Sequence, residues 1–215
     1  MAGCCSRQGY DSFFTEKIAR RDARAYRRRG LDPNARRIVG FVARRGAAAG
    51  SVLDVGGGNG VLGIELLKAG AERAITVELS SSYDTTATDL AREAGVQDRV
   101  ERRVVDFADA VEEFPEADVV VMHRVVCCYP DGEALVAAAA GRARRLLAFS
   151  FPRRAWWTRV GASAVNAYLA ARSMEYRSFI HRPDRLFAAA ETAGLTAVWD
   201  HDGPLWRLAG FERSA

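Results

Sequence analysis

A glycine-rich turn is the part of the sequence whose residue types and spacing are most suited to chemistry. Residues 52–60 read Val-Leu-Asp-Val-Gly-Gly-Gly-Asn-Gly, a short apolar strand candidate that runs into glycines and then into the apolar helix pattern of 61–69. Glycine lets the backbone take positive φ and lets a ligand approach without a Cβ in the way. The following helix supplies free N–H groups and a positive dipole end. The segment therefore predicts a site for a nucleotide-like cofactor.

Two kinds of cofactor are compatible with the spacing of these glycines. Residues 58–63 fit G-x-G-x-x-G, and Glu78 stands where a nicotinamide dinucleotide site has its ribose-binding acid. Residues 54–60 equally fit D-x-G-x-G-x-G. The carboxylate of Asp54 suits a cationic ligand such as a sulfonium amino acid, and it would repel a pyrophosphate. Length favours the second reading, because 50 residues precede the first strand candidate and few remain for a substrate domain.

The elements that must position this turn alternate between strand and helix from residue 51 to residue 151. Strands are expected at 51–55, 75–79, 100–105, 119–122 and 146–151, with helices at 61–69, 84–94 and 131–140. Such alternation indicates right-handed crossovers and a parallel sheet covered on both faces. After a helix at 183–193, strands at 195–199 and 205–211 are joined across Asp202-Gly203-Pro204, which predicts an antiparallel hairpin at the sheet edge. We expect an α/β fold with a doubly wound, seven-stranded, mostly parallel sheet and an antiparallel C-terminal hairpin.

The residues before the first strand predict a helical arm. One amphipathic helix is expected over 10–29, and a second helix begins after Asp32, with Asp32 as N-cap and Pro33 at its first position. We therefore divide the chain into an N-terminal arm or lid at 1–46 and a main domain at 47–215. Within the main domain, the Trp- and Tyr-bearing insertion 152–181 is expected to cap the substrate.

From residue 52 to residue 211 the sequence resembles the class I S-adenosylmethionine-dependent methyltransferases. In that family the glycine motif holds the methionine part of the cofactor. An acid that ends the second strand binds the ribose hydroxyls, and an acid after the third strand holds the adenine amino group. The resemblance implies a Rossmann-like methyltransferase fold with S-adenosyl-L-methionine as cofactor. The residues that it assigns to cofactor binding are Asp54, Gly56, Gly58, Gly60, Glu78, Asp106 and Phe107, the last of them stacking on the adenine.

The acceptor side is expected beyond the fourth strand, because ligands of open α/β sheets bind outside the carboxyl ends of the strands. His123 follows that strand, close to where the transferred methyl group would lie. Methyl transfer from a sulfonium is an in-line displacement that needs alignment and often a base, so His123 is the candidate catalytic residue, as base or as a positioning histidine. Arg124 could neutralise an acceptor carboxylate or phosphate, or form a surface ion pair. Candidate acceptor contacts are Arg124, Tyr129, Tyr10, Phe14 and Trp156, with core packing as the alternative for the aromatic residues.

Composition and charge limit the remaining possibilities. With 49% apolar and 27% charged residues, the chain is a globular protein rather than a disordered one. Residues 1–45 hold twelve basic and four acidic residues, whereas the remainder holds 19 basic and 23 acidic ones. No apolar run is long enough for a membrane span, and the first residues lack a leader-like apolar stretch, so we expect a cytoplasmic protein.

The four cysteines form two adjacent pairs, Cys4–Cys5 and Cys127–Cys128. Neighbouring cysteines bridge each other poorly, and the usual C-x-x-C metal spacing is absent. A four-thiolate zinc site stays open as an alternative, but we expect free thiols and no metal.

The expected function is transfer of a methyl group from S-adenosylmethionine to an oxygen or nitrogen atom of a small molecule. One alternative is an enzyme similar to the magnesium-protoporphyrin O-methyltransferases, because Cys128-Tyr129-Pro130-Asp131 loosely resembles their turn after the fourth strand. A second is an RNA methyltransferase that uses the basic arm, although no aromatic-basic RNA module is recognisable, so we do not expect a nucleic-acid partner. A nicotinamide oxidoreductase and a non-catalytic binding protein with a retained pocket complete the alternatives. The sequence leaves the oligomeric state open.

Overall fold

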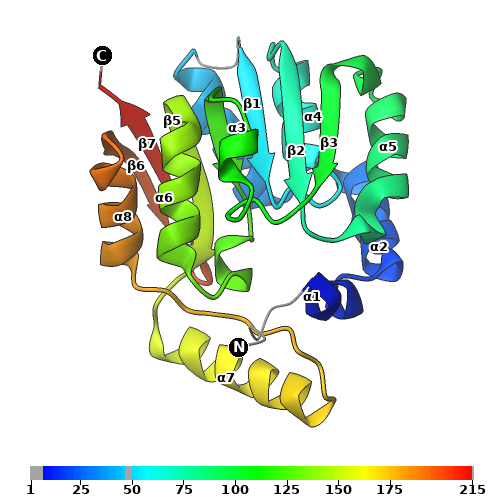
Figure 1. The fold of residues 1–215 in the computed structure, drawn as a ribbon, viewed down its shortest axis with the longest axis vertical. Helices are drawn as coiled ribbons and strands as arrows, with labels where there is room; N and C mark the ends of the chain where they lie inside the picture. The colour runs from blue at the N-terminus through cyan, green and yellow to red at the C-terminus, as the bar shows by residue number, and fades with distance from the viewer. Residues whose placement is uncertain (1–6, 47–49, 215) are drawn as a thin grey trace.

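The computed structural model describes residues 7–46 and 50–214, which are built around one seven-stranded sheet (Figure 1). The strand order is β3-β2-β1-β4-β5-β7-β6. The first five strands run parallel, and β7 is antiparallel to both β5 and β6. The strands are β1 (Ser51–Val55), β2 (Arg73–Glu78), β3 (Val100–Val104), β4 (Ala117–Met122), β5 (Ala143–Pro152), β6 (Leu195–Asp202) and β7 (Trp206–Arg213). The predicted doubly wound sheet with its C-terminal hairpin is confirmed.

The α-helices cover both faces of this sheet, as its apolar central strands require. The helices of the described part are α1 (Arg7–Phe13), α2 (Glu16–Arg29), α3 (Pro33–Arg44), α4 (Val61–Lys68), α5 (Asp84–Glu93), α6 (Gly132–Arg142), α7 (Trp156–Ala171) and α8 (Pro183–Thr192). One apolar core joins α6 and α8 to one face of the sheet, and a second joins α3, α4 and α5 to the other. All five residues of β1 are buried between these layers. The turn that follows β1 is therefore held on a rigid support.

The arm differs from the sequence prediction in one respect, because the single helix expected over 10–29 is two helices. Thr15 lies between α1 and α2 with an extended backbone, at φ −85° and ψ 161°. Neighbouring positions of a continuous helix point about 100° apart, so Phe13 and Phe14 could not both face one partner. With the break, both rings contact Tyr176, at centroid distances of 4.1 Å for Phe13 and 5.3 Å for Phe14.

The insertion 152–181 lies apart from the layers of the sheet (Figure 1). It contains the 16-residue helix α7, which lies beyond the carboxyl edge of the parallel strands, and a return segment that leads to α8. Leu169 is the buried residue of this helix, and it packs into a small cluster with Tyr10, Tyr176 and Cys128. Within the described ranges, no helix combines the length and apolarity needed to cross a bilayer.

Candidate active site

A cavity of about 730 Å³ opens at the carboxyl ends of the parallel strands, between the sheet and the arm. Ten of the residues singled out from the sequence line it: Tyr10, Phe14, Gly56, Gly58, Glu78, Asp106, Phe107, His123, Arg124 and Tyr129. Asp54, Gly60 and Trp156 do not line it. Trp156 is 73% exposed on α7, so the structure does not bring it to this cavity.

The glycine turn packs so closely against the sheet that there is no room for a side chain at Gly56. The Gly56 N–H donates to the Val77 carbonyl of the neighbouring strand at 2.8 Å. Gly56 has φ +66°, and a Cβ there would lie 2.3 Å from Val125, closer than any real contact. The glycine is therefore required both by its backbone angle and by the space around it.

Asp54 lies beneath this turn rather than in the cavity. Its side chain is almost fully buried, and one carboxylate oxygen accepts from the Gly63 N–H at 3.3 Å, near the start of α4. The other oxygen has no hydrogen-bond partner in the part of the chain that the structure describes. Burial raises the pKa of Asp54 to about 7, although the Gly63 hydrogen bond acts in the opposite direction. In this structure Asp54 supports the turn from below and does not face the ligand space.

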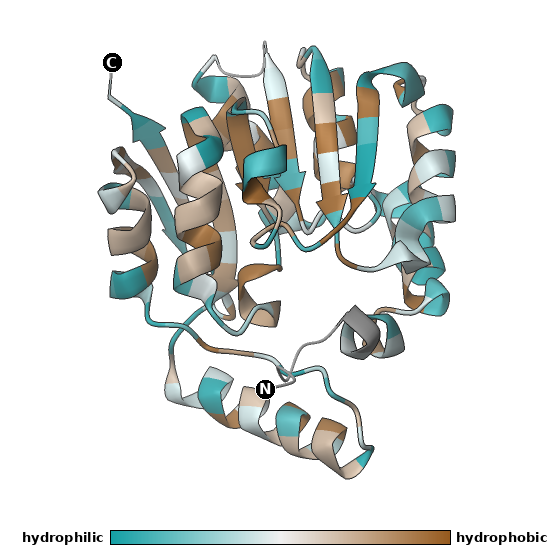
Figure 2. Ribbon diagram, in the orientation of Figure 1, coloured by the Kyte–Doolittle hydropathy of each residue, from teal (hydrophilic) through white to brown (hydrophobic). Residues whose placement is uncertain are grey.

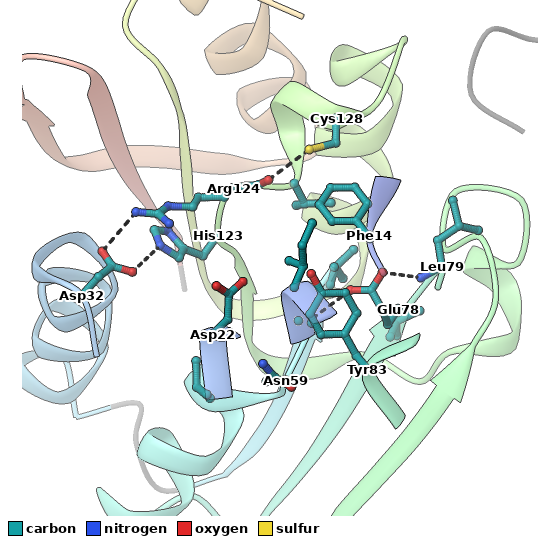
Figure 3. A pocket seen from close by; sticks show the side chains of 18 of the residues that line it. Phe14, Asp22, Asp32, Asn59, Glu78, Leu79, Tyr83, His123, Arg124 and Cys128 are labelled. Atoms are coloured by element: carbon teal, nitrogen blue, oxygen red, sulfur yellow. Dashed lines mark hydrogen bonds and ion pairs between the residues drawn. The ribbon is translucent and has the colours of Figure 1, made fainter. Parts of the chain in front are cut away.

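Glu78 ends β2 and organises the opposite side of the turn (Figure 3). One of its carboxylate oxygens accepts from the Gly58 N–H at 2.8 Å, and the other accepts from Leu79 N–H at 2.8 Å and Ser80 N–H at 3.2 Å. Burial raises the pKa of Glu78, while these backbone donors and the nearby Arg102 charge favour the ionised form. The carboxylate is thereby held in one orientation at the cavity wall.

Asp106 and Phe107 follow β3 and form the far end of the cavity. One Asp106 oxygen accepts from the Ala108 N–H at 3.0 Å, and the other accepts from the Tyr129 hydroxyl at 3.4 Å. Burial raises the pKa of Asp106, and these hydrogen bonds oppose the shift. Phe107 is buried against Phe114, with ring centroids 5.5 Å apart.

His123 follows β4, and its side chain points to Asp32 (Figure 3). Nε2 lies 3.0 Å from an Asp32 carboxylate oxygen, and Nδ1 lies 2.8 Å from the Ser150 hydroxyl. Burial of Asp32 opposes its ionisation, but the hydrogen bond and charge of His123 outweigh it and hold the pKa of Asp32 well below its ordinary value. An ionised Asp32 can only accept, so Nε2 carries a proton. The arrangement leaves His123 no free lone pair for an acceptor, which favours the positioning alternative over that of a base.

Asp32 and Ser150 are site residues that sequence reasoning missed. Asp32 was expected only as the N-cap of α3, and it does cap that helix, accepting from Asn34 N–H at 2.9 Å and Ala35 N–H at 3.3 Å. Ser150 sits in the otherwise apolar end of β5 and is fully buried. A single polar residue near the carboxyl end of an apolar strand pattern was the signal in the sequence that could have identified Ser150 as a site residue.

Arg124 adopts a backbone conformation that is unfavourable for a side chain, with φ +61°. The Ser150 hydroxyl holds it there by accepting from the Arg124 N–H at 2.9 Å. The guanidinium lies 3.8 Å from Asp32 and stacks over the Trp206 ring at 5.4 Å. Backbone strain that the surroundings maintain is common at functional sites, and here it directs a half-exposed cation to the cavity wall.

Cys127 and Cys128 follow Arg124 closely in the sequence and pack in the apolar cluster with Tyr10, Leu169 and Tyr176. Cys127 and Cys128 are buried free thiols with their sulfur atoms 3.7 Å apart, and Cys128 contacts the Tyr176 hydroxyl at 3.1 Å. Within the described residues, no three metal-ligating side chains come together. Cys4 and Cys5 lie outside the described residues.

The arm closes over the cavity through contacts between segments that are distant in sequence. The Tyr10 hydroxyl donates to the Cys128 carbonyl, Ser80 Oγ donates to Asp11 at 2.6 Å, and Asn59 Nδ2 donates to the Ala19 carbonyl at 3.0 Å. Several arm arginines are already paired with acids: Arg20 with Glu16, Arg21 with Asp22, Arg27 with Glu93 and Arg45 with Glu212. The arm is thus built to cover the site, and much of its positive charge is locally compensated.

Comparison with known proteins agrees with this geometry. Residues 52–148, which span β1 to β5 and the glycine turn, match the family model described as a methyltransferase domain. The match makes these residues a methyltransferase domain. Such a domain is an enzyme domain, and the match agrees with S-adenosylmethionine as the predicted cofactor. No curated protein sequence matches the chain significantly.

Solved structures share the fold of this methyltransferase. Magnesium protoporphyrin IX methyltransferase from Synechocystis PCC 6803, with S-adenosylhomocysteine bound, is 20% identical with a TM-score of 0.67, covering 84% of this chain and 82% of that one. The same enzyme with S-adenosylmethionine gives a TM-score of 0.66. An O-methyltransferase family protein from Burkholderia thailandensis is 18% identical with a TM-score of 0.65, covering 84% of this chain and 56% of that one. At these identities the likeness establishes the fold, and the acceptor must be argued from the site.

Proposed function

We propose that this methyltransferase transfers the methyl group to a carboxylate oxygen of a small, largely apolar acceptor. The observation that carries the proposal is the arrangement of Arg124 and His123 at the end of β4. Arg124 offers a cation to the cavity, whereas both nitrogens of His123 are already engaged. An acceptor that arrives ionised fits this arrangement, because it requires a countercharge and no base.

At the cofactor end, five cavity-lining residues would hold S-adenosylmethionine. The Glu78 carboxylate is fixed by three backbone donors and retains acceptor capacity for the ribose hydroxyls. Gly56 and Gly58 leave the backbone open to the methionine part, and Asp106 with Phe107 would receive the adenine. The cavity volume of about 730 Å³ falls in the range of small-molecule and cofactor sites.

When bound, S-adenosylmethionine supplies an electrophilic methyl group on a positively charged sulfur. A carboxylate nucleophile is ionised at neutral pH, so the protein's main task is to align it and to exclude water. Arg124 would orient the carboxylate, and its strained backbone, held by Ser150, would keep the guanidinium in place. His123 acts as a positioning residue that ties the end of β4 to Asp32 at the start of α3.

The rest of the acceptor would meet aromatic and apolar side chains from the arm. Tyr10 and Phe14 line the cavity together with Ile18. We propose that the arm at 1–46 serves as the lid and that 152–181 supports the acceptor side from outside, through Leu169 and Tyr176. The chain's main domain would then be 47–215.

A second candidate acceptor is a magnesium-porphyrin carboxylate. The observation that favours it is the structural likeness to magnesium protoporphyrin IX methyltransferase over 84% of this chain. A porphyrin is flat and apolar and bears carboxylates, so the same Arg124 contact would serve it.

Turnover to S-adenosylhomocysteine with matched acceptors tests the proposal. Aromatic carboxylic acids and a magnesium porphyrin are compared with the corresponding alcohols and amines, and the product is analysed for a base-labile methyl ester. With a carboxylate acceptor we expect the rate to stay level between pH ~6 and ~9, because the nucleophile is ionised throughout. Methylation of only the alcohols or amines, with a rate that falls below pH ~6.5, would contradict the proposal and restore a base role for His123.

A further inference from the structure

The helix α7 exposes most of its apolar side chains. Trp156 is 73% exposed, Trp157 43%, Val160 61% and Tyr168 60%, and the nearby hairpin residue Leu205 is 58% exposed. Only scattered single apolar residues are normally exposed on a soluble protein, so this concentration calls for an explanation. Figure 2 shows the helix at the margin of the molecule, away from the sheet layers.

The exposed residues form one continuous face of the helix. At 100° per residue, Trp156, Val160, Ala164 and Tyr168 recur at intervals of four. Ala167 and Ala171 complete this face, and both are exposed. The helix contacts the body through another stripe, where Leu169 is buried and Thr158, Ala162 and Asn166 are partly covered. Trp157 extends the exposed face to the hairpin, because its Nε1 donates to the Pro204 carbonyl at 3.3 Å.

The charges of the helix and of the residues that adjoin it are all of one sign. Segment 153–172 contains four arginines, Arg153, Arg154, Arg159 and Arg172, and no acidic residue. Arg154 and Arg159 have exposed side chains and no ion-pair partner among the described residues, whereas Arg153 pairs with Asp202 at 3.2 Å. Arg172 lies over the Tyr168 ring. An apolar face with aromatic residues near both ends and arginines beside it has the composition of a helix that lies at a membrane interface.

A second copy of the chain fits this face less well. A two-fold contact through α7 would bring arginines of one copy against arginines of the other, since segment 153–172 offers no carboxylate and the nearby Asp202 already pairs with Arg153. An anionic lipid surface supplies the missing negative charge and covers the Trp side chains at the same time. Because the helix has 16 residues and flanking charges, it would lie in the plane of the interface and not cross it.

We propose that α7, with Leu205 of the β6–β7 hairpin, is a docking surface for anionic lipid membranes. The surface lies beside the acceptor side of the cavity, because Leu169 and Tyr176 join α7 to the cavity-lining Cys128. Docking there would place the enzyme's acceptor side next to a lipid phase. The inference stands on α7 alone and does not require a particular acceptor.

Co-sedimentation of the full chain with vesicles tests this surface. The vesicles are pure phosphatidylcholine, or phosphatidylcholine and phosphatidylglycerol in equal parts. We expect binding to the anionic vesicles, a blue shift of tryptophan fluorescence, and a loss of binding as salt rises from ~0.1 M to ~1 M. A Trp156→Ser/Val160→Ser variant should lose binding at least about tenfold, whereas Trp156→Phe should retain it. An Arg154→Gln/Arg159→Gln variant should bind about fivefold more weakly for each charge removed.

Two controls separate docking from misfolding and from self-association. Arg145→Gln removes an exposed arginine on β5, away from α7, and should leave vesicle binding unchanged. Calorimetric affinity for S-adenosylhomocysteine should equal wild type in every variant, which verifies folding. Absence of binding to the anionic vesicles would overturn the proposal. So would equal binding by the Trp156→Ser/Val160→Ser variant, or a dimer in light scattering that this variant abolishes.

Discussion

The two ends of the cavity are built in different ways. At the proposed cofactor end, Gly56 follows β1, Glu78 ends β2 and Asp106 lies two residues after β3, so the sheet itself places them side by side. At the acceptor end, contacts join segments far apart in the chain, such as Asp32 with His123 and Tyr10 with Cys128. Figure 3 shows Glu78 on one side and the Asp32–His123–Arg124 group on the other.

This difference indicates how the two ends can vary independently. The cofactor end depends on backbone geometry and on carboxylates held by main-chain donors, which an enzyme of this fold must keep to bind the same cofactor. The acceptor end depends on side chains from the arm, β4 and β5, and those can be exchanged without disturbing the glycine turn. Substitutions at one end should therefore leave the ligand affinity of the other end unchanged.

The largest effect is expected at the cofactor end, for Glu78→Ala. The substitution removes the proposed acceptor for the ribose hydroxyls and frees three backbone donors, so cofactor affinity should fall about a hundredfold or more. Calorimetry with S-adenosylhomocysteine measures it, with the exposed Glu72→Ala as control. Wild-type affinity in Glu78→Ala would remove Glu78 from the cofactor site.

A pH effect on stability is expected from Asp54. Its pKa is raised to about 7 in the folded protein, so between pH ~4 and ~7 the folded state holds a proton that the unfolded chain has lost. Stability therefore falls as pH rises through this range. Asp54→Asn should remove that slope and gain on the order of 2 kcal/mol relative to wild type between pH ~5 and ~8. Urea unfolding at pH ~5 and pH ~8 measures the free energy of unfolding of both proteins. The exposed Asp98→Asn variant is the control. The same pH dependence of stability in wild type and Asp54→Asn would contradict the prediction.

At the acceptor end, Arg124→Gln should raise KM for the carboxylate acceptor about tenfold or more and leave cofactor affinity unchanged. Arg124→Gly should raise KM equally but unfold less readily than Arg124→Gln, because glycine tolerates φ +61°. Steady-state kinetics and urea unfolding give both quantities. An unchanged KM in both variants would show that Arg124 does not meet the acceptor.

Asp32→Ala should cost about 1–2 kcal/mol of stability, because it removes both a helix cap and the partner of His123. The lowered pKa of Asp32 means that this contribution is complete above pH ~4 and is lost as pH falls further. Asp131→Ala removes the cap of α6 without a histidine partner and is the matched control. If both variants showed the same acceptor KM as wild type, the Asp32–His123 pair would have only a structural role.

The smallest effect is expected for Tyr10→Phe, which removes the hydrogen bond from the arm to the Cys128 carbonyl. We expect a loss of about 1 kcal/mol or less, visible as faster amide exchange over α1 and α2. Tyr168→Phe on the exposed face of α7 is the control. Equal exchange in the arm of all three proteins would show that this hydrogen bond does not hold the lid.

The same difference between the two ends explains what the sequence could predict. The alternation of strands and helices fixes the sheet, and the acids that end β2 and follow β3 lie in the cavity as expected. The motif predicted Asp54 as a cofactor contact, whereas the structure has it beneath the turn and outside the cavity lining. A motif gives a position along the chain and does not give the side of the turn that a carboxylate faces. The contact of His123 with Asp32 depends on how the arm folds back over the sheet, which no local pattern in residues 1–46 encodes. Trp156 was assigned to the cavity because it is aromatic and follows the fifth strand, and α7 leaves it exposed and outside the cavity lining.

A crystal structure of the full chain with S-adenosylhomocysteine tests the central claim most directly. The account predicts the ribose hydroxyls within hydrogen-bonding distance of Glu78, the adenine beside Asp106 and Phe107, and the amino acid part over the glycine turn. A nucleoside bound elsewhere, or bound in this cavity with Glu78 facing away from the ribose, would contradict it.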